Sequence, residues 1–283
     1  MKKLAWMLMV PAALMALSVS CVDGKSGASA ANENEESVNF VLKSGESMYE
    51  CVGDTLFGED TPLYSSVSAS VMWPEFVQGN DVKSLQDSLL SMCFGKDAVG
   101  QSVDAALKNY LADAPQADVS KLKPVDSIPS DGMVRILSRE VEASILSLKE
   151  DWLIYKVYNY VYEGGAHPLY FTTFVNYDIK GGRVVGLEDL FKEGTGADVI
   201  AAIKANLYGR YRAANDVELA EYSGINVEEL YVTPTFYIVD GYVVFHYNPY
   251  EVGPWVIGAI EVPVPVYQLE TLLTDDARDM LGM

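Results

Sequence analysis

Hydrophobic and polar residues alternate along several stretches of the chain, and a period of two is typical of strands that bury one face. Other stretches are rich in β-branched and aromatic residues, which also favours strands. The stretches expected to form strands are 38–42, 67–73, 133–148, 151–162, 169–179 and 256–264. Between 133 and 179 the connections are short, so antiparallel pairing is expected, because a parallel crossover needs about a dozen residues.

Hydrophobic residues three and four positions apart predict helices elsewhere. One helix is expected to begin with Asp81 as its N-cap and to stop at Gly95. Further helices are expected over 103–111, 197–214 and 267–273. The polar, proline-containing stretch 113–131 predicts a long surface connection.

A tight hairpin is expected where Phe236–Val239 and Tyr242–Tyr247 flank Asp240-Gly241, since a type I′ turn needs two residues with positive φ. Pro263 places the strand 256–264 at a sheet edge. Strands and helices come in groups, without strict alternation. The sequence therefore predicts an α+β fold of antiparallel sheets with packed helices, in two intimately joined subdomains.

The N-terminal residues have the pattern of an export signal. Two lysines precede a short apolar stretch, and small residues lie just before Cys21. Residues 1–20 are thus predicted to be a signal peptide, and 21–37 a flexible tether. The residues before Cys21 resemble a lipobox, which makes Cys21 the expected lipidation site; cleavage by an ordinary signal peptidase is the alternative. The protein is expected to be exported and lipid-anchored to the bacterial cell envelope, where its N-terminal lipid would bind the membrane.

The charge narrows the classes of partner. The 283 residues are 49% hydrophobic and carry a net charge of −20. This composition can bury a core and excludes a disordered chain. A nucleic-acid partner is not expected, because binding phosphates needs a basic surface; cationic partners are favoured instead.

Cysteine and histidine offer little for metal chemistry. Beyond Cys21, Cys51 and Cys93 remain, and two readings stay open: a disulfide in an oxidising compartment, or two buried thiols. The two histidines, His167 and His246, lack zinc-binding spacing, so no metal and no cofactor are predicted. The sequence also lacks a Gly-x-Ser-x-Gly elbow, a P-loop and a Gly-x-Gly-x-x-Gly motif.

Two ordered motifs resemble the DUF3298 family. The first is Tyr160–His167, followed by Asn176–Asp178 and by the run 187–191; the second is Phe245–Trp255, followed by a Val-Pro-Val-Pro strand. The resemblance covers about 150–275 and makes 149–283 a DUF3298-like domain, with 38–148 as the DUF4163-like region that often precedes it. Such tandems resemble the extracellular part of RsiV anti-sigma factors, which sense lysozyme, and the non-catalytic region of PdaC peptidoglycan deacetylases. The resemblance implies an envelope-facing domain without established chemistry.

The candidate ligand-binding residues lie within these two motifs. They are Tyr162, Gly164, Gly165, His167, Tyr250, Glu251 and Trp255. Each also has a structural interpretation: the glycines suit a hairpin turn, an imidazole is commonly bonded to the backbone, and Glu251 can satisfy loop amides. The tyrosines of 155–162 suit packing, sugar stacking or a protein-binding face.

The sequence therefore predicts an envelope lipoprotein whose ectodomain binds or senses a ligand without catalysis of its own. A cationic protein such as lysozyme, or a cell-wall glycan, is the expected partner. The alternative is a glycan-acting cell-wall enzyme that uses Glu251 or His167.

Overall fold

The computed structural model of the protein describes residues 38–52, 61–115, 121–130, 133–149 and 151–283. The predicted signal peptide, Cys21 and the tether lie outside these described residues. Within the described ranges, no helix is long and apolar enough to cross a membrane.

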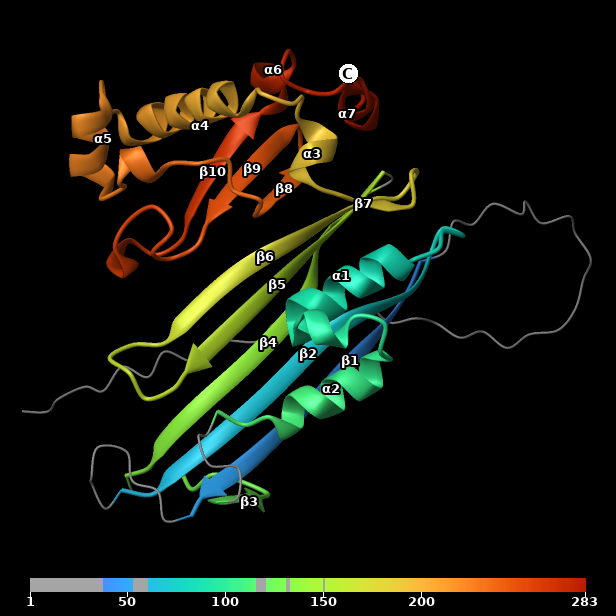
Figure 1. Cartoon of the computed structure of the whole chain (residues 1–283), viewed down its shortest axis with the longest axis vertical. Coiled ribbons are helices and arrows are strands. Elements are labelled where there is room, and N and C mark those ends of the chain that lie inside the picture. The colour runs from blue at the N-terminus through green and yellow to red at the C-terminus, as the bar shows by residue number, and fades with distance from the viewer. Residues whose placement is uncertain (1–37, 53–60, 116–120, 131–132, 150) are drawn as a thin grey trace, which may run out of the picture. The chain divides into compact units, whose positions relative to one another are not determined.

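Seven strands form a mixed sheet in the order β3-β1-β2-β4-β5-β6-β7 (Figure 1). They are β1 (Val38–Cys51), β2 (Leu63–Val77), β3 (Leu122–Val125), β4 (Arg135–Leu148), β5 (Trp152–Tyr162), β6 (Leu169–Asp178) and β7 (Arg183–Val185). The predicted antiparallel pairing is confirmed for β4, β5 and β6. The general expectation of antiparallel sheets does not hold for β2 and β4, which run parallel. Two helices between these strands provide the long crossover that parallel pairing requires.

These two helices, α1 (Lys83–Phe94) and α2 (Val103–Ala112), cover one face of the seven-stranded sheet (Figure 1). Leu85 and Leu89 of α1 join Val71 and Val141 of the sheet in one buried cluster. Gly95 ends α1 with a φ of 90°, as expected. The predicted N-cap is off by one residue, because Val82 takes that position. The Asp81 carboxylate still accepts the Lys83 N–H at 2.9 Å.

The predicted surface connection 113–131 contains β3, which pairs with the end of β1. No strand was predicted there because β3 spans four residues, has no buried residue and includes Pro124. Such a strand is confined to a sheet edge, where β3 lies.

A second sheet has three antiparallel strands in the order β10-β9-β8, namely β8 (Phe236–Val239), β9 (Tyr242–Tyr247) and β10 (Ile260–Pro265). The predicted hairpin is confirmed, since Asp240 and Gly241 have φ values of 49° and 79°. The edge position of β10 is also confirmed. This strand begins later than predicted, because Trp255–Ile257 form a 3-10 turn.

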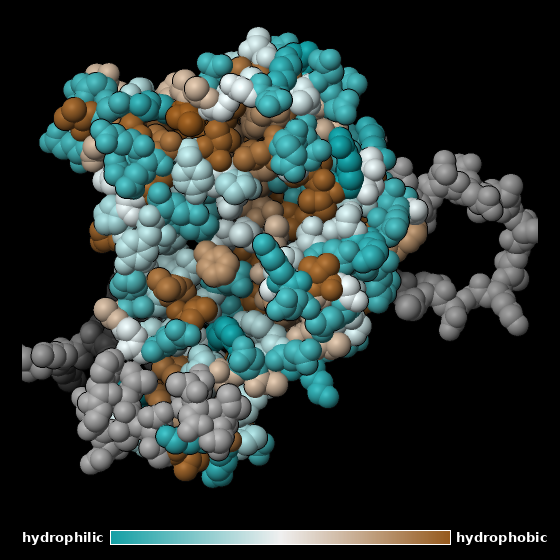
Figure 2. Space-filling model, in the orientation of Figure 1, coloured by the Kyte–Doolittle hydropathy of each residue, from teal (hydrophilic) through white to brown (hydrophobic). Residues whose placement is uncertain are grey.

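Five short or medium helices accompany the second sheet in the described part of the chain. They are α3 (Leu187–Leu190), α4 (Gly196–Tyr211), α5 (Asp216–Ser223), α6 (Val266–Leu269) and α7 (Asp275–Met280). Ile203 and Leu207 of α4 share a buried cluster with Phe245 and Tyr247 of β9. In the view of Figure 2, hydrophobic residues are densest over α4 and this sheet. The predicted α+β class is confirmed.

Cys51 and Cys93 are both buried, and no disulfide joins them. Cys51 lies in a small cluster with Leu63 and Leu137, whereas Cys93 of α1 lies in the cluster beneath the helices. The disulfide reading is thus not supported, because the two side chains belong to separate clusters. Burial raises the pKa of Cys93 to about 12.

The predicted regions 38–148 and 149–283 share one sheet. Their boundary falls between β4 and β5, which pair along most of their length. The division into these two regions stays a prediction.

Candidate functional site

Two loops far apart in sequence meet beside the start of β6. One connects β5 to β6 and carries His167; the other connects β9 to β10 and carries Tyr250 and Trp255. His167 Nε2 lies 3.0 Å from the Tyr250 hydroxyl, and its ring stacks on Trp255 with 4.3 Å between ring centroids. Three of the predicted site residues therefore form one cluster.

The first loop turns at Gly164, which has a φ of 84°. Gly165 does not adopt a positive φ, and a Cβ added there would meet nothing closer than His167 O at 3.9 Å. Gly164 alone therefore needs the backbone freedom of glycine. His167 Nδ1 lies 2.9 Å from the Pro168 carbonyl oxygen, in agreement with the backbone-bonded interpretation of this imidazole.

The second loop is held by close backbone packing. A Cβ added to Gly253 would lie 2.8 Å from the carbonyl oxygen of Gly224, the residue that ends α5. Nearby, the Asn226 N–H donates to the Val252 carbonyl at 2.7 Å. Glu251 accepts the Asn248 N–H at 2.7 Å, so its carboxylate satisfies a loop amide. Tyr250 has a φ of 75°, and its side chain is 56% exposed.

Two further aromatic rings extend this cluster onto the seven-stranded sheet, and we call the resulting set of five rings the aromatic row. Its members, in spatial order, are Tyr158, Tyr170, Trp255, His167 and Tyr250. Successive ring centroids lie between 4.3 and 6.4 Å apart. The indole N–H of Trp255 is buried and has no hydrogen-bond partner among the described residues.

The tyrosines of β5 divide by strand face. Tyr155 is fully buried and donates to the Met72 carbonyl at 2.8 Å, so it is a packing residue. Tyr158 points to the other face and belongs to the aromatic row. Burial raises the pKa of Tyr158, and its hydroxyl stays a hydrogen-bond donor at neutral pH.

Tyr162 does not join the aromatic row. With Gly164, Gly165 and the residues 134–137 at the start of β4, it lines a separate open cavity of about 450 Å³. The seven candidate residues therefore do not form one site. Tyr162 ends β5 five positions before His167 and lines this cavity, whereas His167, Tyr250 and Trp255 lie in the aromatic row.

A polar network under the second loop was not predicted. His246 is 5% exposed; its Nδ1 lies 3.3 Å from Glu261, and its Nε2 lies 3.3 Å from the Asn248 side-chain oxygen. The hydrogen bond with His246 lowers the pKa of Glu261. His246 alternates with Phe245 and Tyr247 along β9 and so lies on the other face of this sheet, where Phe174 of β6 packs against it.

Sequence reasoning also missed Tyr170 and Asn248. Both lie in or beside the quoted motifs, yet their roles depend on contacts between β6 and the second loop. Across the described ranges, no group of three or more His, Cys, Asp or Glu side chains could hold a metal ion.

Comparison with known proteins supports the fold. A DUF3298-family crystal structure from Bacteroides fragilis NCTC 9343 is 20% identical, with a TM-score of 0.67, over 88% of this chain and 98% of that one. A DUF3298-family crystal structure from Pseudomonas aeruginosa PAO1 is 16% identical, with a TM-score of 0.55, over 84% and 96%. No curated protein matches the chain.

The family comparison covers the second motif. The matched residues, 188–267, begin after β7 and include Phe245–Trp255, but not Tyr160–His167 of the first motif. The match therefore begins later in the chain than the expected start near residue 150. Residues 188–267 of this protein match the family described as "Protein of unknown function (DUF3298)".

Proposed function

We propose that the protein is an exported, lipid-anchored binding module that captures a ligand at the aromatic row and carries out no catalysis. The row itself supports this proposal, since it combines an exposed tyrosine with a tryptophan. Tyr250 is 56% exposed, and its ring lies beside the stacked rings of His167 and Trp255. Tyrosine and tryptophan contribute strongly to binding because they offer a large apolar surface and a hydrogen-bonding group.

The acidic charge of the chain favours a basic protein as the ligand. The whole chain carries −20, and exposed Glu163 lies in the same loop as His167. A basic protein would be attracted over a distance and then held by contacts to the aromatic rings. Lysozyme is the proposed example, in keeping with the resemblance to lysozyme-sensing proteins, and the DUF4163-like reading of 38–148 belongs to the same proposal.

The alternative enzyme receives less support from the geometry. His167 already contacts the Tyr250 hydroxyl and the Pro168 carbonyl. Glu251 accepts a backbone N–H of its own loop. A general base needs a free position within hydrogen-bond reach of the substrate, and both side chains instead serve to hold the loops.

Calorimetry of the full chain with lysozyme tests the proposal. We expect saturable binding that persists at about 0.15 M salt, where the Debye length is about 8 Å. Tyr250→Ala should weaken this binding by about tenfold or more. Tyr222→Ala is the matched control, because Tyr222 is 55% exposed and lies on α5, outside the row.

Three outcomes would contradict the proposal. Heat that vanishes at the higher salt would indicate diffuse charge attraction. Equal binding by Tyr250→Ala and Tyr222→Ala would remove the aromatic row from recognition. Turnover of peptidoglycan fragments by the purified chain, lost in Glu251→Gln, would favour the enzyme.

A further inference from the structure

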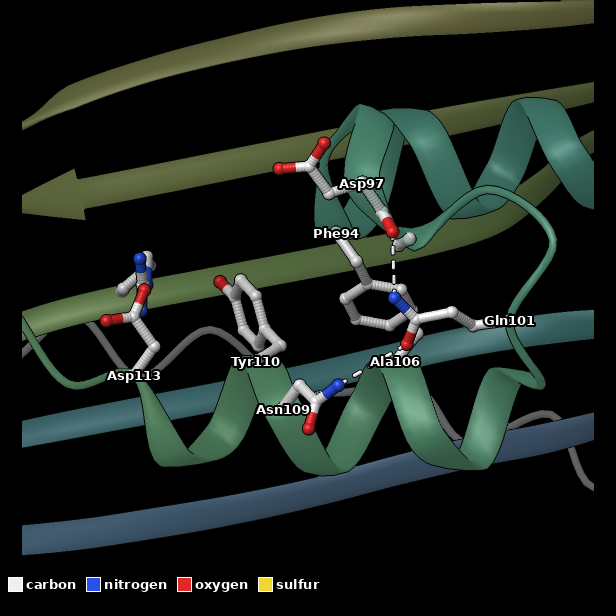
Figure 3. A pocket seen from close by; sticks show the side chains of 9 residues that line it. Phe94, Asp97, Gln101, Ala106, Asn109, Tyr110 and Asp113 are labelled. Carbon is white, nitrogen blue, oxygen red and sulfur yellow. Dashed lines mark hydrogen bonds and ion pairs between the residues drawn. The ribbon is translucent and has the colours of Figure 1, made fainter.

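A second pocket lies on the helix-covered side of the seven-stranded sheet, away from the aromatic row. It has a volume of about 450 Å³ and lies between the end of α1, helix α2 and strand β4. Figure 3 shows the Tyr110 ring between Asp113 on one side and Phe94 on the other, with the Asp97 carboxylate above them. The volume is within the range of small-molecule sites.

Arg139 reaches this pocket from β4. Its guanidinium lies over the Tyr110 ring, with Cζ 4.9 Å from the ring centroid, and its Nη2 donates to Asp113 at 2.9 Å. Its Nε is buried and has no hydrogen-bond partner among the described residues. Arg139 lines the pocket with a side chain that is 25% exposed, so its guanidinium can donate to a ligand that accepts hydrogen bonds.

The aromatic wall of the pocket is firmly placed. Phe94 and Tyr110 pack edge to face with 5.4 Å between their centroids. Burial raises the pKa of Tyr110 to about 12, so its hydroxyl remains protonated at neutral pH. The wall therefore offers an apolar surface next to groups that donate and accept hydrogen bonds.

The polar lining limits the class of ligand. Asp97 and Asp113 outnumber Arg139 among the charged lining residues, which disfavours an anion. A purely apolar ligand would remove these charged groups from water without compensation. A hydroxyl suits both kinds of partner, because it can accept from the Arg139 guanidinium and donate to a carboxylate.

We propose that the pocket between α1, α2 and β4 binds a neutral sugar unit of a glycan. The Arg139 guanidinium donates to one hydroxyl, the carboxylates of Asp113 and Asp97 accept from neighbouring hydroxyls, and the carbon face of the sugar ring packs against Phe94 and Tyr110. This site shares no residue with the aromatic row, so its test is independent of the test of the proposed function.

The chain offers a matched control for Arg139. Arg139 and Asp113 link β4 to the end of α2 with side chains that are 25% and 73% exposed. Lys43 and Asp104 link β1 to the start of α2 at 3.0 Å, with side chains that are 25% and 71% exposed. Arg139→Gln and Lys43→Gln thus each remove one similar ion pair, but Lys43 does not line the pocket.

The experiment measures binding of neutral trisaccharides, chitotriose and maltotriose, to the full chain by ligand-observed NMR and calorimetry. We expect one of them to bind, and Arg139→Gln to weaken that binding by about tenfold or more. Lys43→Gln and Tyr250→Ala should bind as the unchanged protein does. Asp97→Asn, at an exposed rim position, should weaken binding without affecting folding.

The proposal is overturned if neither trisaccharide binds, or if Arg139→Gln and Asp97→Asn both bind as well as Lys43→Gln. Free amino acids form a further arm of the titration, since an ammonium and a carboxylate could also satisfy this lining. Binding of amino acids without sugars would assign the pocket to that class and reject the glycan. Sugar binding lost in Tyr250→Ala but kept in Arg139→Gln would move the sugar to the aromatic row.

Discussion

Asn248 forms hydrogen bonds with both backbone groups of Thr172. Its side-chain oxygen accepts the Thr172 N–H at 2.6 Å, and its side-chain nitrogen donates to the Thr172 carbonyl at 3.1 Å. The amide therefore takes the place of a neighbouring strand at this point of β6. Asn176 of β6 makes the reverse link to β8. Its side-chain nitrogen donates to the Phe236 carbonyl at 2.9 Å, and its side-chain oxygen accepts the Ile238 N–H at 3.1 Å. Two asparagine side chains thus join the two sheets.

Replacing Asn248 by alanine should destabilise the protein by about 2–4 kcal/mol, since both backbone groups of buried Thr172 would lose their partner. Chemical denaturation measures this change. Asn39→Ala is the control, because Asn39 bonds to Glu75 at an exposed position, and it should cost less than about 1 kcal/mol. Equal losses for the two variants would show that Asn248 does not join the sheets.

The two glycines of the first loop should respond differently to alanine. Gly164→Ala should lower the free energy of unfolding by about 1–2 kcal/mol, because its φ of 84° is unfavourable for a residue with a Cβ. Gly165→Ala should leave stability unchanged or raise it by up to about 1 kcal/mol, since the added methyl has room. Thermal melts of both variants decide this, and a larger loss for Gly165→Ala would contradict the assignment.

Local signals predicted local structure well. Asp240-Gly241 identified the β8–β9 hairpin because a type I′ turn depends on two adjacent residues. The parallel pairing of β2 with β4 could not be inferred in the same way, since it depends on where α1 and α2 pack. β3 was not predicted because a short edge strand with a proline lacks a hydrophobic pattern.

The candidate site was predicted in parts. The motifs identified His167 and Tyr250 separately, yet their contact joins residues 83 positions apart. It forms because Asn248 ties the second loop to β6, a relationship that no local pattern reveals. Arg139 was missed for the same reason: an arginine in a strand gives no indication that a helix places Tyr110 beneath it.

Anchoring by Cys21 remains a prediction with a direct test. Cys21→Ser should move the protein from the membrane fraction to the soluble fraction, because the proposed lipid anchor would be lost. Fractionation followed by immunodetection measures this, with Cys93→Ser as the control for loss of a cysteine. Unchanged membrane association of Cys21→Ser would reject the lipid anchor.

Acid should weaken the contact between β9 and β10. The pKa of Glu261 is lowered from its ordinary 4.5 chiefly by the hydrogen bond with His246. A carboxylate with a lowered pKa in the folded state contributes stability above its ordinary pKa, and this contribution is lost as the pH falls through the folded value. The protein should therefore lose stability from this pair below about pH 4.5.

Glu261→Gln tests the direction of this pH dependence of stability. The variant cannot ionise, so we expect it to be less stable than the unchanged protein near pH 6 and to approach it as the pH falls toward about 3. Melting temperatures across this range give the comparison, and Glu221→Gln at an exposed position of α5 serves as the control. If the difference between Glu261→Gln and the unchanged protein stays constant with pH, the Glu261–His246 pair does not contribute a pH-dependent stabilisation.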